Sequence, residues 1–224
     1  MNQDCESNEE KNVLKPKNQQ NAIKSLVMDS NFNQKLENLP SGLRDLTLGW
    51  CFNQKLENLP NRLQYLAMGS YFNQKLENLP NSLQNLTFSY NSHFNQKLEN
   101  LPNGLRNLTL GNSFNQKLEN LPRCLQNLTL GYRFNHKLEN LPSSLQNLTL
   151  GPSFNQKLDI CIALPRLQNL TISSDYIFKP PPLFGTVIIY EDNYGFILRS
   201  VYQNYENYDT NKWKNIFYKS INIK

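Results

Sequence analysis

Residues 32–40, FNQKLENLP, decide the fold because the same nine residues occur five times without change. These copies begin at Phe32, Phe52, Phe72, Phe94 and Phe114, and the near copies FNHKLENLP and FNQKLDICIALP begin at Phe134 and Phe154. The spacing is 20 residues, except for 22 between Phe72 and Phe94. An active site needs its chemistry once, whereas a stacked array needs the same geometry in every layer. A period of 20 residues predicts a solenoid, because it is too short for a propeller blade or a helix pair.

Each unit carries too few apolar residues to form a core alone. In the third copy they are Phe72, Leu76, Leu79, Leu83, Leu86 and Phe88. Stacked coils would bury these positions against each other in columns. At the end of the unit Leu86 and Phe88 alternate with Asn85 and Thr87, which is typical of a short strand with one buried face. We expect neighbouring coils to pair these strands in parallel, about 4.8 Å apart.

The other half of each coil is predicted to be extended rather than helical. A proline follows one leucine of each unit, and a residue before proline favours extended geometry. These leucines are Leu39, Leu59, Leu79, Leu101, Leu121 and Leu141. A glycine follows most strands, at Gly49, Gly69, Gly111, Gly131 and Gly151, where we expect turns with positive φ. The predicted fold is a leucine-rich-repeat-like solenoid with short parallel strands and an extended, non-helical return side.

Three polar columns recur in every unit. An Asn follows each of the seven phenylalanines, and a ladder of such side chains can satisfy backbone groups at a bend. Contact with a ligand is the alternative role for this Asn column. A Lys column begins at Lys35 and an acidic column at Glu37, and both are interpreted as a solvated face.

Composition places the chain among soluble intracellular proteins, with the cytoplasm as the expected compartment. Its net charge is +5, and residues 32–174 hold all of the excess, with 13 basic and 8 acidic residues. This excess is too mild to predict nucleic-acid binding. The chain start lacks a secretory pattern, and no apolar run is long enough for a membrane span. The scattered cysteines Cys5, Cys51, Cys124 and Cys161 predict free thiols and no zinc site.

Four segments are predicted along the chain. Residues 1–22 form a polar N-terminal segment, and residues 23–31 form a half-repeat cap because Ile23, Leu26 and Met28 reproduce the strand spacing. Residues 32–174 hold seven repeats. Residues 175–224 form a C-terminal cap and tail, in which TVIIY and GFILRSV predict a hairpin over the open end.

The repeat pattern F-N-x-x-L-x-x-L-P-x-x-L-x-x-L-x-L-G over residues 32–174 resembles the FNIP repeat, a leucine-rich-repeat relative. Gln-Lys, or once His-Lys, stands where Ile-Pro gives the family its label. The family is found mainly in social amoebae and in giant DNA viruses of the mimivirus type. For a viral protein the resemblance implies the host cytoplasm and a host protein partner. Family members often carry an N-terminal F-box that couples them to a ubiquitin ligase, but we expect none in the 22 residues before the first half-repeat.

A non-catalytic protein–protein interaction scaffold is the predicted function. No nucleotide, hydrolase or metalloprotease motif occurs, and His93 and His136 have no metal-ligand spacing, so no enzyme activity, metal or cofactor is expected. Two alternatives stay open. One is self-association through the solenoid ends, and the other is substrate recognition within a ubiquitin ligase.

The predicted partner-binding residues are those that vary between otherwise identical units. They are Trp50, Tyr65, Tyr71, Tyr90, Arg44 and Arg62. Aromatic and Arg side chains are the commonest interface anchors, and all six belong to neighbouring coils in the N-terminal half. The alternative interpretation is that turns tolerate any residue. No nucleic-acid or membrane partner is expected.

Overall fold

The computed structural model describes residues 22–159, 164–173, 175–176, 186–190 and 197–198. The predicted N-terminal segment and most of the predicted C-terminal cap and tail lie outside these residues.

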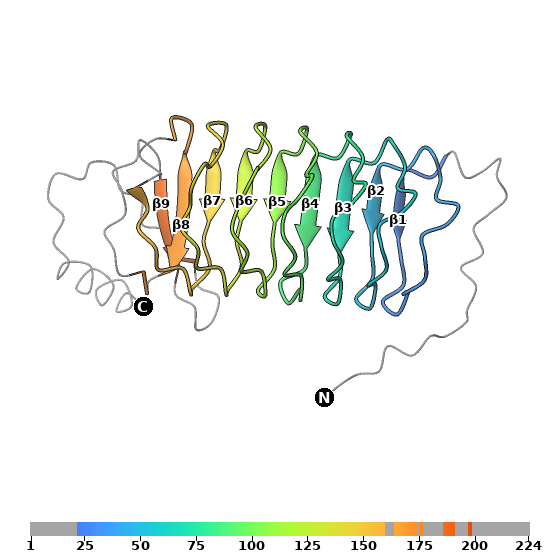
Figure 1. Cartoon of the computed structure of the whole chain (residues 1–224), viewed down its shortest axis with the longest axis horizontal. Coiled ribbons are helices and arrows are strands. Elements are labelled where there is room, and N and C mark those ends of the chain that lie inside the picture. Colours follow the sequence, from blue (N-terminus) through green and yellow to red (C-terminus); the bar gives the residue numbers. More distant parts are fainter. Residues whose placement is uncertain (1–21, 160–163, 174, 177–185, 191–196, 199–224) are drawn as a thin grey trace, which may run out of the picture.

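One ten-stranded sheet runs through the molecule, with its strands in sequence order (Figure 1). The strands are β1 (Ser25–Val27), β2 (Asp45–Thr47), β3 (Tyr65–Met68), β4 (Asn85–Phe88), β5 (Asn107–Thr109), β6 (Asn127–Thr129), β7 (Asn147–Thr149), β8 (Asn169–Ser173), β9 (Thr186–Tyr190) and β10 (Ile197–Leu198). Strands β1 to β9 pair in parallel, as the predicted solenoid requires. Strand β10 pairs antiparallel with β9, which confirms the predicted hairpin next to the last coil.

In neighbouring strands, residues at equivalent positions of the repeat lie opposite each other. Leu46 faces Leu66, Leu66 faces Leu86, and Leu86 faces Leu108 across consecutive strand pairs. In β4 the side chains of Leu86 and Phe88 are buried, whereas Asn85 and Thr87 are half-buried. This alternation confirms the predicted inward and outward faces, because a one-residue slip would turn every leucine of the strand away from the core.

The repeated phenylalanine forms a second column through the core. Successive rings from Phe32 to Phe154 lie parallel, with centroids 6.1–6.2 Å apart. Tyr176 continues this column beyond the last phenylalanine, stacked at 6.1 Å on Phe154. Its hydroxyl donates a hydrogen bond to the Gln156 carbonyl oxygen at 2.9 Å. The core is therefore one continuous set of ring and leucine columns rather than a cluster within each unit.

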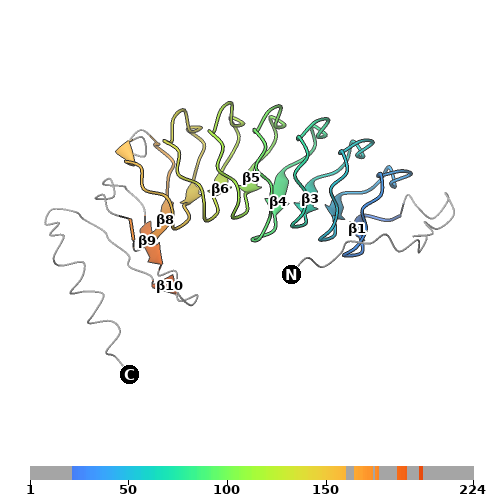
Figure 2. The ribbon, with the colours of Figure 1, turned by 60° about the horizontal axis from the view of Figure 1, so that its bottom comes forward.

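The return side of the coils contains no α-helix within the described residues. Six coils turn toward the strand at the proline, where the proline carbonyl oxygen accepts a bond from the N–H three residues on, as in Pro60 to Leu63. In the last coil the Leu164 carbonyl oxygen accepts the equivalent bond from the Leu167 N–H. Figure 2 shows the array bending into an arc, with the strands along the inner side and the return segments fanned along the outer side. The outward strand residues therefore lie on a concave face.

The asparagine of each Glu-Asn-Leu-Pro segment occupies the left-handed region, which sequence reasoning missed. These residues are Asn38, Asn58, Asn78, Asn100, Asn120 and Asn140, with φ of 54–58°. Among non-glycine residues, Asn adopts this conformation most readily. This explains why the position before the Leu-Pro pair is an asparagine in six units.

The glycine column has a different cause from the predicted one, because none of its five members has a φ in the left-handed region. Instead, consecutive coils approach too closely at this point for a side chain. A Cβ on Gly69 would lie 2.0 Å from the Gly49 carbonyl oxygen, and one on Gly151 would lie 2.1 Å from that of Gly131. The prediction of positive φ at these glycines is therefore wrong, and close backbone contact between coils is the reason that glycine is required.

The cysteines also depart from the prediction. Cys51 is buried and disulfide-bonded, so the prediction of a free thiol is wrong for this residue. Cys124 is a free, exposed thiol.

Candidate partner-binding site

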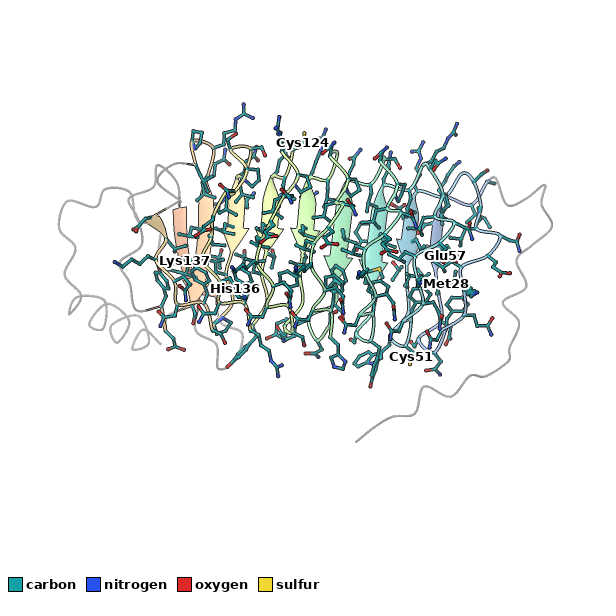
Figure 3. The ribbon with its side chains drawn as sticks, in the orientation of Figure 1. Met28, Cys51, Glu57, Cys124, His136 and Lys137 are labelled. Carbon is teal, nitrogen blue, oxygen red and sulfur yellow. The ribbon has the colours of Figure 1, made fainter. Side chains whose placement is uncertain are left out.

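Two rows of turns border the concave face. We call the turns before each strand, such as Pro60 to Leu63, the leading turns, and those after each strand, such as Gly49 to Cys51, the trailing turns. In Figure 3, Cys51 of a trailing turn lies at the lower edge of the array and Cys124 of a leading turn lies at the upper edge. The two rows are therefore separated by the length of the strands.

The six predicted binding residues divide between these two edges. Arg62 lies in a leading turn, Arg44 directly precedes β2, and Tyr65 is the first residue of β3. Both arginines are exposed, and Tyr65 is half-buried. The remaining residues, Trp50, Tyr71 and Tyr90, lie at the opposite edge, in the trailing turns. The structure thus places the predicted residues in two separate groups rather than in one patch.

Three consecutive trailing turns bring aromatic side chains into contact. The Trp50 and Tyr71 ring centroids are 6.5 Å apart with a tilt of 51°, and the His93 ring meets the Tyr71 ring edge-on at 5.1 Å. We call Trp50, Tyr71 and His93 the aromatic row. His93 was not among the predicted binding residues. Its position in the sequence could have indicated His93, because Tyr71 and His93 each directly precede the repeated phenylalanine of their coil.

Backbone hydrogen bonds between coils hold the aromatic row in place. The Tyr71 N–H donates to the Trp50 carbonyl oxygen at 3.0 Å, and the His93 N–H donates to that of Ser70 at 2.7 Å. The two inserted residues are accommodated in the turn after β4. There the Ser70 and Ser89 hydroxyls are 2.9 Å apart. Tyr90, in the same turn, remains 69% exposed.

The concave face carries a second feature, a ladder of asparagine side chains. Each Nδ2 donates to the Oδ1 of the preceding coil, in the order Asn169, Asn147, Asn127, Asn107, Asn85. A column of half-buried threonines lies beside it. The ladder starts at Asn85 because Tyr65 and Asp45 occupy the same position in the two preceding coils. The amide groups of this ladder are thus already bonded to each other.

The asparagine that follows each phenylalanine has the structural role that the sequence favoured. The Asn33 Oδ1 accepts from the Asn53 backbone N–H at 2.8 Å, and the same bond links every later coil. The neighbouring Gln54 donates from Nε2 to the Asn33 carbonyl oxygen at 3.0 Å. His136 replaces this glutamine in its coil and contacts the Asn115 carbonyl oxygen through Nε2 at 3.0 Å. His136 therefore belongs to the coil-to-coil bonding.

The columns that begin at Lys35 and Glu37 are exposed along their whole length, as a solvated face should be. Within the described ranges, no group of three or more His, Cys, Asp and Glu side chains is placed to hold a metal ion. The described part of the chain also contains no helix that is long and apolar enough to span a membrane.

Parallel strands in register, a leucine and phenylalanine core and a return side that has no α-helix in the described part of the chain define a solenoid of the leucine-rich-repeat kind. The FNIP repeat model matches residues 52–91, 94–133 and 134–175, more than half of the sequence, so the chain belongs to the FNIP repeat family.

A solved structure shares the fold. It is the crystal structure of CroV588, a giant-virus protein described as a novel circular LRR protein structure. It superposes with a TM-score of 0.64 at 44% sequence identity, over 70% of this chain and 24% of CroV588. This chain therefore spans about a quarter of the length of CroV588. No curated protein shows significant similarity to the chain.

Proposed function

We propose that this protein is a non-catalytic protein–protein interaction scaffold that binds its partner through the trailing turns and the adjoining concave face. The aromatic row carries this proposal. Trp50 of this row is 53% exposed, and Tyr90 in the turn of His93 is 69% exposed. Two of the three later trailing turns hold Asn112-Ser113 and Pro152-Ser153 instead, and the third holds Tyr132-Arg133.

The rigid frame beneath these rings favours recognition. Each trailing turn is bonded to its neighbours, so the rings are held in a fixed arrangement before a partner arrives. Preorganised aromatic side chains lose little conformational freedom on binding, and such residues contribute most of the affinity at protein interfaces. Repeat arrays present extended surfaces of this kind.

The test is capture of partners with matched variants of the full chain. Trp50→Ala/Tyr71→Ala removes two rings of the aromatic row, while Tyr132→Ala/Arg133→Ala changes the two equivalent positions of a later coil. We expect proteins that the wild type retains to be lost with the first variant and kept with the second. Circular dichroism checks that both variants are folded. Equal retention by both variants would argue against this site, and no specific capture under any condition would argue against a scaffold.

Self-association is a second candidate, supported by the N-terminal end of the sheet. Strand β1 is the first strand of the sheet, and Val27 on it is 70% exposed. Ile23, Leu26 and Met28 are only partly buried, unlike the later members of their columns. An edge strand offers backbone groups for pairing with another chain. Since CroV588 is described as circular and is about four times longer, several copies of this arc joined end to end would span a similar length.

A further inference from the structure

The positive charge of the repeats is concentrated on one edge of the sheet. Residues 32–174 carry seven lysines and seven Glu or Asp residues in the two return-side columns, and these charges cancel each other. The remaining charged residues of this range are six arginines and Asp45, so arginine supplies the whole excess. Arg133 lies in a trailing turn, whereas the other five arginines lie at the leading turns. We call these five the arginine rim: Arg44, Arg62, Arg106, Arg123 and Arg166.

The guanidinium groups of the arginine rim are exposed and unpaired. All five residues are exposed to solvent, and none of their side chains makes a hydrogen bond or an ion pair within the described part of the chain. The backbone beneath them is held by neighbouring coils. The Arg44 carbonyl oxygen accepts from the Gln64 N–H at 2.7 Å, and the Arg106 carbonyl oxygen accepts from the Gln126 N–H at 2.8 Å. The rim therefore presents free guanidinium groups on a rigid frame.

The fold does not require arginine at these positions. Arg44 and Arg106 directly precede their strands, and the other five coils hold glutamine at the same position: Gln64, Gln84, Gln126, Gln146 and Gln168. The position of Arg62 and Arg166 holds glycine, serine or cysteine in the remaining coils. Because the coils stack in the same way with these uncharged residues, the arginines are available for a role outside the fold.

We propose that the arginine rim binds an acidic segment of a protein partner. This second binding surface goes beyond the proposed function, because it lies at the opposite edge of the sheet from the aromatic row. A guanidinium group offers a planar fork of N–H donors that matches the two oxygens of a carboxylate. The leading turns, taken with the residue after each, contain no carboxylate of their own; they are residues 40–44, 60–64, 80–84, 102–106, 122–126, 142–146 and 164–168.

The length of the rim fits a short extended segment. Arg44 precedes β2 and Arg166 precedes β8, so six coil steps separate them. At about 4.8 Å for each step the rim is about 29 Å long, and an extended segment of about nine residues covers it. Every second side chain of such a segment points to the same side, so acidic residues at alternate positions would all face the rim.

The composition of this edge favours a peptide over single-stranded nucleic acid. Sites for single strands combine cationic side chains with aromatic rings on which the bases stack. The seven leading turns contain no aromatic residue, and the exposed rings of Trp50 and Tyr90 belong to the opposite edge. The arginine rim therefore has the charge that a polyanion requires but lacks a stacking surface for bases.

The test measures binding of the full chain to a labelled, capped peptide of five Glu-Ser pairs by fluorescence anisotropy at about 0.1 M salt. The matched probes are a peptide of five Gln-Ser pairs, which lacks the charge, and an oligonucleotide of ten thymidines. We expect saturable binding of the glutamate peptide and at least tenfold weaker binding of the glutamine peptide. Absence of saturable binding, or equal binding of the two peptides, would overturn the proposal. Tighter binding of the oligonucleotide than of the glutamate peptide would also overturn it, in favour of nucleic acid.

Two double variants with the same change of net charge locate the site. Arg44→Gln/Arg106→Gln introduces the residue that other coils already carry, whereas Lys35→Gln/Lys97→Gln removes two charges from the return side of the same coils. We expect at least threefold weaker binding of the glutamate peptide by the first variant and less than twofold change with the second. Circular dichroism checks that both are folded. Equal losses would show that the peptide responds only to net charge, which contradicts a site at the arginine rim.

The variant Trp50→Ala/Tyr71→Ala separates this proposal from the proposed function. It should abolish partner capture and leave the affinity for the glutamate peptide unchanged, because the two surfaces lie at opposite edges. Loss of peptide binding in this variant would place the acidic segment on the aromatic row and overturn the arginine rim. If capture does not depend on the rings while the glutamate peptide still binds through the arginines, the aromatic site fails and the arginine rim stands.

Discussion

Asparagine, which accounts for 35 of the 224 residues, has three separate roles within a single coil. In the fourth coil, Asn100 adopts the left-handed conformation, Asn95 bonds the backbone of the next coil, and Asn107 belongs to the ladder on the concave face. The same side-chain chemistry therefore serves a backbone turn, the outer bend and the sheet. Each role is open to a test by substitution.

The left-handed position predicts a specific order of stabilities. Asn78 has a φ of 58°, which a β-branched residue adopts only with strain. We expect Asn78→Val to lower the free energy of unfolding by about 1–2 kcal/mol and Asn78→Gly to change it much less. Urea denaturation measures both. Equal losses would show that the asparagine side chain, rather than the backbone conformation, is what the position requires.

The glycine column predicts a contrast between two alanine substitutions. A Cβ on Gly131 would lie 2.3 Å from the Gly111 carbonyl oxygen, so Gly131→Ala must push two coils apart. We expect a loss of about 1–3 kcal/mol. At Gly104, in a leading turn, the nearest atom would be 3.2 Å away, and Gly104→Ala should stay within about 1 kcal/mol of the wild type. A comparable loss at both sites in thermal unfolding would contradict the close-approach explanation.

At the scale of single residues, sequence reasoning found the columns but not always their cause. The glycines were assigned to turn conformation because a repeated glycine after a strand fits either explanation, and only the distance between coils separates the two. The asparagines with left-handed backbone conformation were missed because asparagine also occurs at several other positions of each repeat. The aromatic row could not be foreseen in full, because whether His93 meets Tyr71 depends on the path of the two inserted residues.

At the scale of strands, the alternation of apolar and polar residues was sufficient to predict the structure. Every repeat ends with an apolar residue at each second position, and this pattern predicted the parallel strands, their buried leucines and the outward-facing, half-buried amide column. Hydrogen bonds between the amides could not be predicted with the same certainty, since the sequence does not say how each side chain is rotated.

The inward and outward positions of β4 predict very different responses. Leu86 is fully buried between Leu66 and Leu108, so Leu86→Ala leaves a cavity. We expect a loss of about 2–5 kcal/mol in the free energy of unfolding. Asn85→Ala removes one bond at the end of the ladder and should cost about 1 kcal/mol. Denaturant titration of both variants checks this order, and equal losses would mean that the two faces of the strand have been confused.

The effect of an asparagine substitution on stability should depend on its position in the ladder. Asn127 both donates to Asn107 and accepts from Asn147, whereas Asn85 only accepts from Asn107. Asn127→Ala breaks two bonds and leaves two half-buried amide groups with fewer partners, so it should cost about 1 kcal/mol more than Asn85→Ala. If both substitutions had the same effect on the unfolding midpoint, the ladder would not be a cooperative element of the sheet.

At the scale of the whole molecule, the two ends of the sheet differ. The last coil is followed by β9 and the antiparallel β10, whereas β1 begins the sheet with an exposed Val27. If the second candidate function is right, light scattering of the full chain should show a mass that rises with concentration, and Val27→Lys should reduce it because charge on an edge strand opposes pairing. A monomer at every concentration would exclude self-association and leave the scaffold unaffected.

Near-identical interfaces between coils also predict that the array tolerates the loss of a whole layer. Deleting residues 114–133 would bring Phe134 against Phe94 and Asn135 against Asn95, which are the same pairs that the intact chain forms at other steps. We expect the shortened chain to fold with the same circular dichroism spectrum per residue and a somewhat lower midpoint in urea, since repeat-array stability is a sum over coils and their contacts. Loss of cooperative unfolding would show that the coils are not interchangeable.

This interchangeability has a consequence at the level of the gene. Nearly identical repeats in the coding sequence can misalign during replication or recombination, and an in-frame gain or loss of one unit would join surfaces that already fit. The number of repeats can therefore change between related strains without misfolding. The exposed turn residues, such as Trp50 and Tyr90, pack on no neighbouring core and are free to diversify. The phenylalanine and asparagine columns would be inherited as a copied module, and recognition would be the property that each copy acquires afterwards.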